Sequence, residues 1–287
     1  MKSKLSLFLW GGLVMVLALT LALYEATREK LFFEANQIVS PDISLGPIVA
    51  YFFSVVGILT LVLFITPLSK LRLVFRILFA LMFAWGVFVI TALTLPTAGA
   101  YPVAIIAGIS WLFWPRVWLH NLLFLIALAG AGSVFGFLFS PWTFMIFMLI
   151  IAVYDILAVH FGFMVWMVDK LSESTTLPAF IFPKQIRDWK LSLQNVRLDE
   201  IKKNESAERE YTVLGGGDVG FPLMLAVSIY FTTNLASAIF VGVFALVGLM
   251  SALLIQLLWL KGKPIPALPP IAGLSLIGFI IASSFLS

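Results

Sequence analysis

The chain has 287 residues, of which 62% are hydrophobic and only 11% are charged, and its mean hydropathy is +1.09. This composition excludes a soluble globular domain and a nucleic-acid-binding protein, and it indicates a polytopic membrane protein. The net charge is +4, and the absence of cysteine excludes disulfides, thiolate zinc sites and cysteine nucleophiles.

The hydrophobic segments predict an all-α, polytopic membrane protein with nine transmembrane helices, because a helix needs about 20 apolar residues to cross a bilayer. The first segment is predicted to be a retained span, since its apolar run is long for a signal peptide and no cleavage site of small residues precedes Tyr24. The predicted spans are 5–24, 46–67, 72–95, 101–114, 117–139, 142–168, 212–234, 236–260 and 267–286.

The predicted spans divide the chain into three parts. Residues 1–168 hold the first six helices, residues 169–211 form a long loop, and residues 212–287 hold the last three helices. Every lysine and arginine except Arg28 and Lys30 falls on the same side as the N-terminus. Cytoplasmic segments carry the excess of basic residues. The N-terminus and the long loop are therefore predicted to be cytoplasmic, and the C-terminus external, in a cell membrane.

Two acidic residues remain inside the predicted spans. All the others fall in the first external loop or in the long cytoplasmic loop, which leaves Asp155 and Asp218, and their spans contain no lysine or arginine. A carboxylate at the centre of a bilayer costs about 2.5–3.5 kcal/mol. The two acids are therefore predicted to face each other or a water-filled cavity.

Depth along the helices supports this pairing. Asp218 follows Tyr211 by seven residues, and a bend near Gly162 would leave Asp155 seven residues from the end of its own span. Both acids would then lie about 10 Å from the cytoplasmic ends of their helices. Two close carboxyl groups that share one proton can activate a water molecule and polarise a peptide carbonyl.

Three short motifs accompany these acids in chain order: "YD" at 154–155, "GGGD" at 215–218 and "PAL" at 266–268. On the sixth, seventh and ninth predicted spans, they resemble those of the presenilin and signal-peptide-peptidase family of intramembrane aspartyl proteases. The chain is most similar to a compact microbial homologue, such as an archaeal one. The resemblance implies a presenilin-like fold and an endopeptidase that hydrolyses peptide bonds within transmembrane segments.

The resemblance also implies the roles of individual residues. Asp155 and Asp218 match the catalytic aspartates, and no metal or cofactor is implied. The implied partners are substrate proteins with a transmembrane segment and the lipid bilayer, without nucleic acid. The residues that match positions supporting the active site or binding the substrate are Tyr154, Gly215, Gly216 (the variable position of the glycine motif), Gly217, Pro266, Ala267 and Leu268.

Other functions fit the sequence less well. A proton-coupled transporter also uses membrane carboxylates, but its usual inverted repeats are not seen here. The prepilin peptidase group shares the glycine–aspartate motif but lacks the PAL segment. His120 and His160 do not form a zinc-protease motif. The stretch "GAGSVFG" at 130–136 favours helix packing over a serine–histidine site. The apolar stretch 177–183 predicts an interfacial helix or a plug over the active site.

Overall fold

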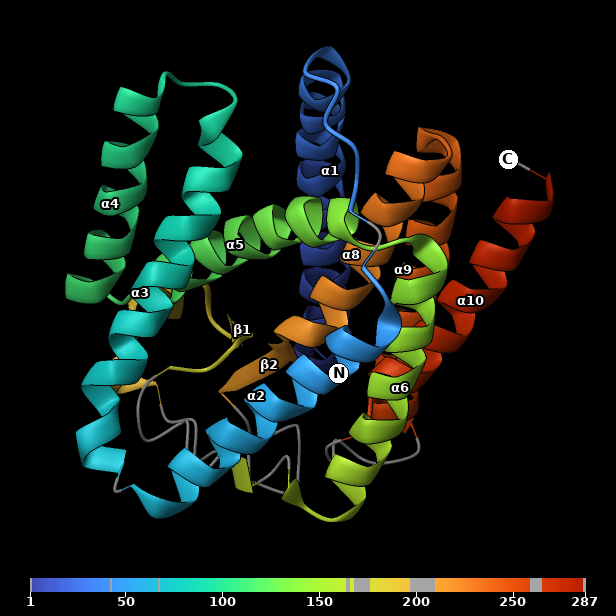
Figure 1. The fold of residues 1–287 in the computed structure, drawn as a ribbon. Helices are drawn as coiled ribbons and strands as arrows, with labels where there is room; N and C mark the ends of the chain where they lie inside the picture. Colours follow the sequence, from blue (N-terminus) through green and yellow to red (C-terminus); the bar gives the residue numbers. More distant parts are fainter. Residues whose placement is uncertain are drawn as a thin grey trace.

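The structure is a computed structural model that describes residues 2–41, 43–66, 68–163, 166–167, 176–196, 210–258 and 265–285. In these ranges it contains nine α-helices and one two-stranded antiparallel sheet (Figure 1). Each helix coincides with one predicted span, which confirms the predicted number and order. The helices are α1 (Lys2–Ala35), α2 (Leu45–Ile65), α3 (Leu68–Ala92), α4 (Thr97–Phe113), α5 (Val117–Leu138), α6 (Pro141–His160), α8 (Gly216–Thr232), α9 (Leu235–Leu258) and α10 (Leu268–Phe285).

The lengths and surfaces of the helices suit a bilayer. Seven of those described are long and apolar enough to cross a membrane, and α4 and α8 are shorter apolar helices. Large apolar side chains stay exposed on the outer helices, such as Tyr51 and Phe64 of α2 and Ile106 of α4. In water such a surface would drive aggregation, whereas in lipid it is the favourable surface.

Helix α8 is the central helix of the bundle. It packs against α1, α5, α6, α9 and α10, and most of its residues are buried. The predicted role of "GAGSVFG" is confirmed where α5 crosses α8. A Cβ atom added at Gly132 would lie 2.9 Å from Leu223, and one at Gly136 would lie 2.5 Å from Val227. The two helices therefore approach too closely for any larger residue on α5.

The sheet joins two segments that flank the long loop. Strands β1 (Ala179–Pro183) and β2 (Tyr211–Gly215) are antiparallel, with Ala179 opposite Gly215 and Pro183 opposite Tyr211. Two predictions were therefore wrong. Residues 179–183 of the apolar stretch form a strand rather than an interfacial helix, and residues 211–215 form a strand instead of the first turns of a helix. The β-branched and aromatic side chains of "YTVL" favour a strand, and the following glycines disfavour earlier helix initiation.

The described part of the long loop packs on the helices rather than standing apart. Short 3-10 helices occupy Ile186–Lys190 and Leu193–Asn195. The backbone N–H of Leu193 donates to Pro115, and that of Val117 donates to Leu191, so this segment pairs with the turn between α4 and α5. The remainder of the predicted loop, 169–175 and 197–209, lies outside the described residues.

The predicted bend after the sixth span is present. Helix α6 ends at His160 and Gly162 has a φ of 72°, a left-handed conformation that glycine adopts without steric cost. The predicted span 142–168 is thereby shortened. Helix α1 shows the opposite change, because it runs to Ala35 instead of ending near residue 24.

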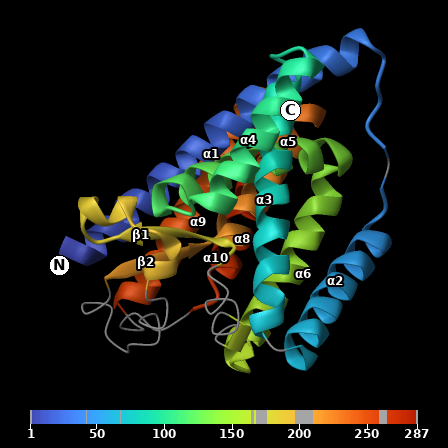
Figure 2. The ribbon, with the colours of Figure 1, turned by 90° about the vertical axis from the view of Figure 1, so that its left-hand side faces the viewer.

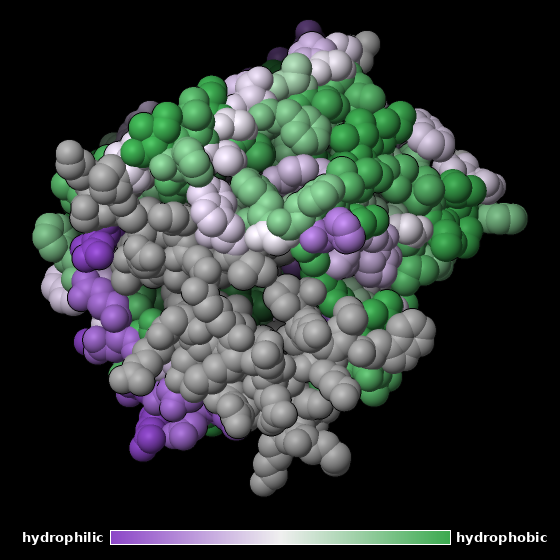
Figure 3. Space-filling model, turned by 90° about the horizontal axis from the view of Figure 1, so that it is seen from below, coloured by the Kyte–Doolittle hydropathy of each residue, from purple (hydrophilic) through white to green (hydrophobic). Residues whose placement is uncertain are grey.

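The two ends of the bundle differ in character. Both strands, the start of α1 and the start of α10 lie at one end, and the C-terminus lies toward the other (Figures 1 and 2). We call the first of these the sheet end. Seen from below, this end shows hydrophilic surface along one side and mostly hydrophobic surface over the rest of the described residues (Figure 3).

Candidate active site

Asp155 lies in the last two turns of α6, at the sheet end of the bundle. The start of α6 is fixed by Pro141 in its first turn and by the Ser140 hydroxyl, which accepts a hydrogen bond from the N–H of Thr143. These features set where the helix begins. The Asp155 side chain is half-buried.

Asp218 lies in the first turn of α8, and its side chain is also half-buried. The expected depth of seven helical residues past Tyr211 is wrong, because residues 211–215 form β2. Asp218 still lies within electrostatic reach of Asp155. The structure therefore brings together the two acids that the sequence paired, one from each of two contacting helices.

The PAL segment contacts Asp155. Ile265, Pro266 and Ala267 are not helical, and α10 begins at Leu268. The backbone N–H of Leu268 donates to Oδ2 of Asp155 at 3.2 Å, and the N–H of Ala267 also interacts with this carboxylate. The predicted interruption of the helix is present, and it supplies amide groups to one of the two acids.

Tyr154 points elsewhere. Its ring packs edge-on against Phe52 and Phe53 of α2, with ring centroids 6.3 and 5.7 Å apart. It therefore joins α6 to the outermost helix, and no hydrogen bond from its hydroxyl to either acid is found among the described residues.

The three glycines before Asp218 meet different surroundings. A Cβ atom on Gly215 would lie 3.0 Å from the Asp218 carboxylate, and one on Gly217 would lie 3.2 Å from the Phe221 ring. Gly216 is the tightest, because its Cβ would lie 2.4 Å from the ring of Phe124. Its N–H also donates to the carbonyl of Pro178 at 3.0 Å, which continues the sheet by one pair.

We expect Gly216→Ala to lower activity more than Gly217→Ala, although position 216 is the variable one in the motif. The new methyl group at 216 meets a buried aromatic ring of α5, whereas position 217 is exposed. Relief requires α5 and α8 to separate at the candidate site, and overpacking of this kind costs about 1–3 kcal/mol. Peptidase assays and thermal unfolding of both variants test this. Equal activities would contradict it.

The structure contains a second buried acid pair that the sequence prediction missed. Glu25 and Glu29 were assigned to an external loop, but both lie on α1 and are 0% and 7% exposed. The Ser133 hydroxyl donates to Glu29 at 3.0 Å, and Arg28 lies 3.4 Å from Glu25. The signal was available, because no proline or glycine interrupts the helical pattern between residue 24 and Pro41.

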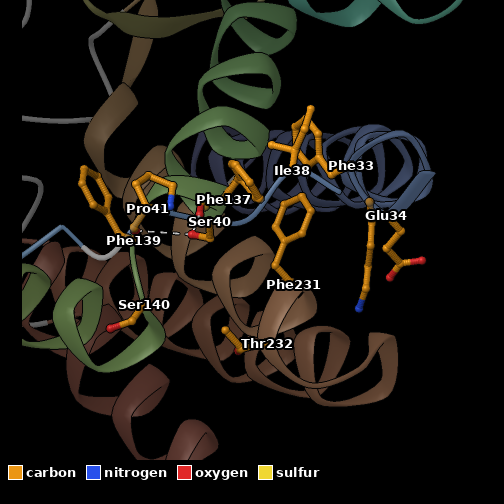
Figure 4. Close-up of a pocket in the computed structure, with 12 residues that line it drawn as sticks. Phe33, Glu34, Ile38, Ser40, Pro41, Phe137, Phe139, Ser140, Phe231 and Thr232 are labelled. Carbon is orange, nitrogen blue, oxygen red and sulfur yellow. Dashed lines mark hydrogen bonds between the residues drawn. The ribbon is translucent and has the colours of Figure 1, made fainter. Parts of the chain in front are cut away.

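A cavity of 370 Å³ lies at the end of the bundle opposite the two aspartates (Figure 4). It opens between the ends of α1, α5 and α8, and its lining contains none of the predicted site residues. Thr232, which lines it, is the last residue of α8, whereas Asp218 is in the first turn of that helix. The lining residues are Lys30, Phe33, Glu34, Ile38, Ser40, Pro41, Gly136, Phe137, Phe139, Ser140, Phe231 and Thr232.

Comparisons with known proteins agree with this arrangement. Residues 7–287 match the family model described as signal-peptide peptidase, presenilin aspartyl protease. Two crystal forms of a presenilin family intramembrane aspartate protease are similar in fold. The form in space group C222 has a TM-score of 0.67 at 18% identity, covering 98% of this chain and 100% of that one. The form in space group P2 has a TM-score of 0.59 at 19% identity, covering 96% of each chain. A search of curated proteins found no match.

Proposed function

Because the chain belongs to the signal-peptide peptidase and presenilin aspartyl protease family, we propose that Asp155 and Asp218 are its catalytic pair. The observation that carries this proposal is the meeting of three distant motifs. Asp155 from α6 and Asp218 from α8 are within electrostatic reach, and the backbone N–H of Leu268 donates to Asp155. The transporter alternative has no support from the family match.

The proposed reaction is hydrolysis by a water molecule held between the two carboxyl groups. The ionised carboxylate takes a proton from the water, whose oxygen attacks the peptide carbonyl carbon. The protonated carboxyl gives its proton to the carbonyl oxygen, which forms a tetrahedral diol. The diol then returns that proton as the C–N bond breaks, and the first carboxyl protonates the leaving nitrogen. Both aspartates recover their starting states, and the products are a carboxylic acid and an amine.

The PAL segment has a positioning role in this scheme. The N–H of Leu268 donates to Oδ2 of the Asp155 carboxylate, and the N–H of Ala267 also interacts with this carboxylate. A carboxylate held by backbone amides keeps a fixed orientation, which favours in-line attack on the substrate.

The proposed substrates are transmembrane segments of other proteins. A helical peptide bond is shielded by its own hydrogen bonds, so the substrate must unwind near the bond that is cut. An unwound segment needs new backbone partners, which the edge of β2 next to Asp218 can supply by strand addition. The non-helical backbone at Pro266 and Ala267 lies beside Asp155.

The proposed orientation puts the sheet end in the cytoplasm of a cell membrane. By the sequence assignment, every lysine and arginine other than Arg28 and Lys30 lies on the same side as the N-terminus, as the positive-inside rule requires. Since the chain has no cysteine, single cysteines introduced at either end can be tested with an impermeant reagent on intact cells, and only those at the end opposite the sheet should be labelled. Labelling of a cysteine at position 185 by an impermeant reagent would contradict the proposed orientation.

The experiment that tests the function is incubation of the purified protein with a synthetic transmembrane peptide. We expect new carboxyl and amino termini within the membrane-spanning part of the peptide, detected by mass spectrometry. An aspartyl transition-state analogue should block their formation, because such compounds mimic the tetrahedral diol. Cleavage that resists the analogue, or no cleavage by protein that remains folded, would refute the proposal.

A further inference from the structure

The outer edge of β1, which faces away from β2, is covered by two side chains from the start of α5. The Nε2–H of His120 donates to the carbonyl of Ala179 at 3.0 Å. The Asn121 side-chain amide makes a pair of bonds with Ile181. Its Nδ2 donates to the Ile181 carbonyl at 2.7 Å, and its Oδ1 accepts from the Ile181 N–H at 3.0 Å. An asparagine amide bonded in this way reproduces the pairing of a neighbouring strand.

The register of the sheet shows which backbone groups of β1 face this edge and whether its N–H groups are bonded. The hydrogen bond between Pro178 and Gly216 fixes which residues of β1 face β2, because the direction of the backbone groups alternates along a strand. The N–H and C=O groups of Phe180 and Phe182 therefore face β2. The outward groups therefore belong to Ala179, Ile181 and Pro183. The N–H of Ala179 donates to Leu177 at 2.8 Å, and proline has no N–H. Every outward N–H of β1 is thus bonded or missing.

The outer edge of β2 is different. By the same alternation, the backbone groups of Val213 and Gly215 point away from β1. No hydrogen bond to the N–H of either residue is found within the described part of the chain. Within the described residues, one edge of the sheet is therefore closed and the other is open at Val213 and Gly215, the second of which lies three residues before Asp218.

The side chains that close β1 are held rigidly. His120 is fully buried, and its ring is stacked on Phe124 with centroids 5.7 Å apart. Trp111, Phe79 and Phe83 surround the same ring, with centroids 5.6–6.5 Å away. Phe124 is also the ring that a Cβ atom on Gly216 would meet. One face of α5 therefore contacts both β1 and the glycines that precede Asp218.

We propose that His120 and Asn121 act as a substitute third strand, which closes the β1 edge so that an unwound substrate pairs only with β2. They are positioning residues, because they touch neither acid and act through the sheet. This inference rests on the proposed function. In this inference, α5 determines through these two residues which peptide bond of the substrate is cut.

The test uses Asn121→Leu, which keeps the side-chain volume but removes both hydrogen bonds to Ile181. We expect KM for a transmembrane peptide to rise about tenfold, because a sheet that these two bonds no longer hold is less well preorganised for the substrate. We also expect the products to spread over bonds adjacent to the wild-type cleavage position, because β2 loses its fixed register. His120→Phe keeps the aromatic packing and removes one bond, so it should give the same spread to a smaller degree.

The matched control is Ser228→Ala. It removes one buried hydrogen bond, from the Ser228 hydroxyl to the carbonyl of Phe139, far from β1 on the same helix as Asp218. It should change thermal stability without changing the cleavage position. If Asn121→Leu and His120→Phe gave the wild-type products, as is expected of Ser228→Ala, the inference would be wrong while the catalytic pair would stand. If the wild-type protein itself cut nothing, the proposed function would fail instead.

A second measurement keeps the inference testable should Asn121→Leu not fold. Backbone amide hydrogen exchange is measured with and without bound peptide on the Asp218→Asn protein, which carries no other substitution. The Ile181 N–H should be protected in both states, and the Val213 N–H only when the peptide is bound. Protection that the peptide adds at Ile181 rather than at Val213 would overturn the inference.

Discussion

Asp155→Asn and Asp218→Asn are each expected to abolish peptide hydrolysis while leaving a folded, extractable protein. Asparagine keeps the size of the side chain but can neither take a proton from water nor return one to the leaving nitrogen. General acid–base catalysis contributes about 10²–10⁴-fold per group. The rate of each variant should therefore fall by at least about 10³-fold, measured by mass spectrometry of the products. Thermal unfolding of each variant measures the fold separately.

The matched control for these variants is Glu29→Gln. It makes the same carboxyl-to-amide change on another buried acid, and the amide oxygen can still accept the hydrogen bond from Ser133. It should retain most of the activity. Near wild-type cleavage by either aspartate variant would eliminate the catalytic pair. An equal loss of activity in Glu29→Gln would indicate that replacing a buried acid lowers the activity by destabilising the fold.

Ala267→Trp is expected to reduce cleavage severely without unfolding the protein. Ala267 is half-buried in the non-helical segment beside Asp155, and Leu268 next to it donates to that carboxylate. An indole at this position would fill the space through which an unwound substrate approaches. We expect a loss of at least about 10²-fold in kcat/KM, as misplacement near reacting groups implies.

The control for the PAL variant is Ile277→Trp on α10, the helix that follows Ala267, where the Ile277 side chain is 48% exposed. The substrate offers a complementary test, because glycines placed near its cleaved bond lower the cost of unwinding. The softened peptide should be cut faster than a rigidly helical one. If the two peptides were cut at equal rates and Ala267→Trp had no effect on cleavage, substrate unwinding would be rejected. The assignment of the aspartate pair would still stand.

The helices could be predicted from the sequence because the bilayer imposes a simple requirement. Each span needs a run of apolar residues, and all nine runs became helices in the described chain. The ends were less certain, since hydropathy does not report where a helix stops. Helix α1 continues through the charged residues after Tyr24 because nothing in that sequence breaks it.

The sheet could not be predicted, because a short apolar run suits a strand or a buried helix equally well. The decision between them depends on a partner about thirty residues away, as Phe180 and Leu214 show. His120 was set aside for a similar reason, since its partner is the carbonyl of Ala179. The acids, by contrast, were recognisable because an unneutralised carboxyl group within a span is rare.

The unequal lengths of the outer helices have a consequence for the surrounding lipid. Helix α4 has 17 residues and exposes Tyr101, Ile105 and Ile106, whereas α9 has 24 residues. At 1.5 Å per residue these helices are about 26 and about 36 Å long. The hydrophobic belt is therefore uneven around the perimeter, and the bilayer must thin beside α4 or the whole protein must tilt to reduce the mismatch. Lipids with longer chains increase this deformation on the α4 flank, while the flank formed by α9 accommodates them.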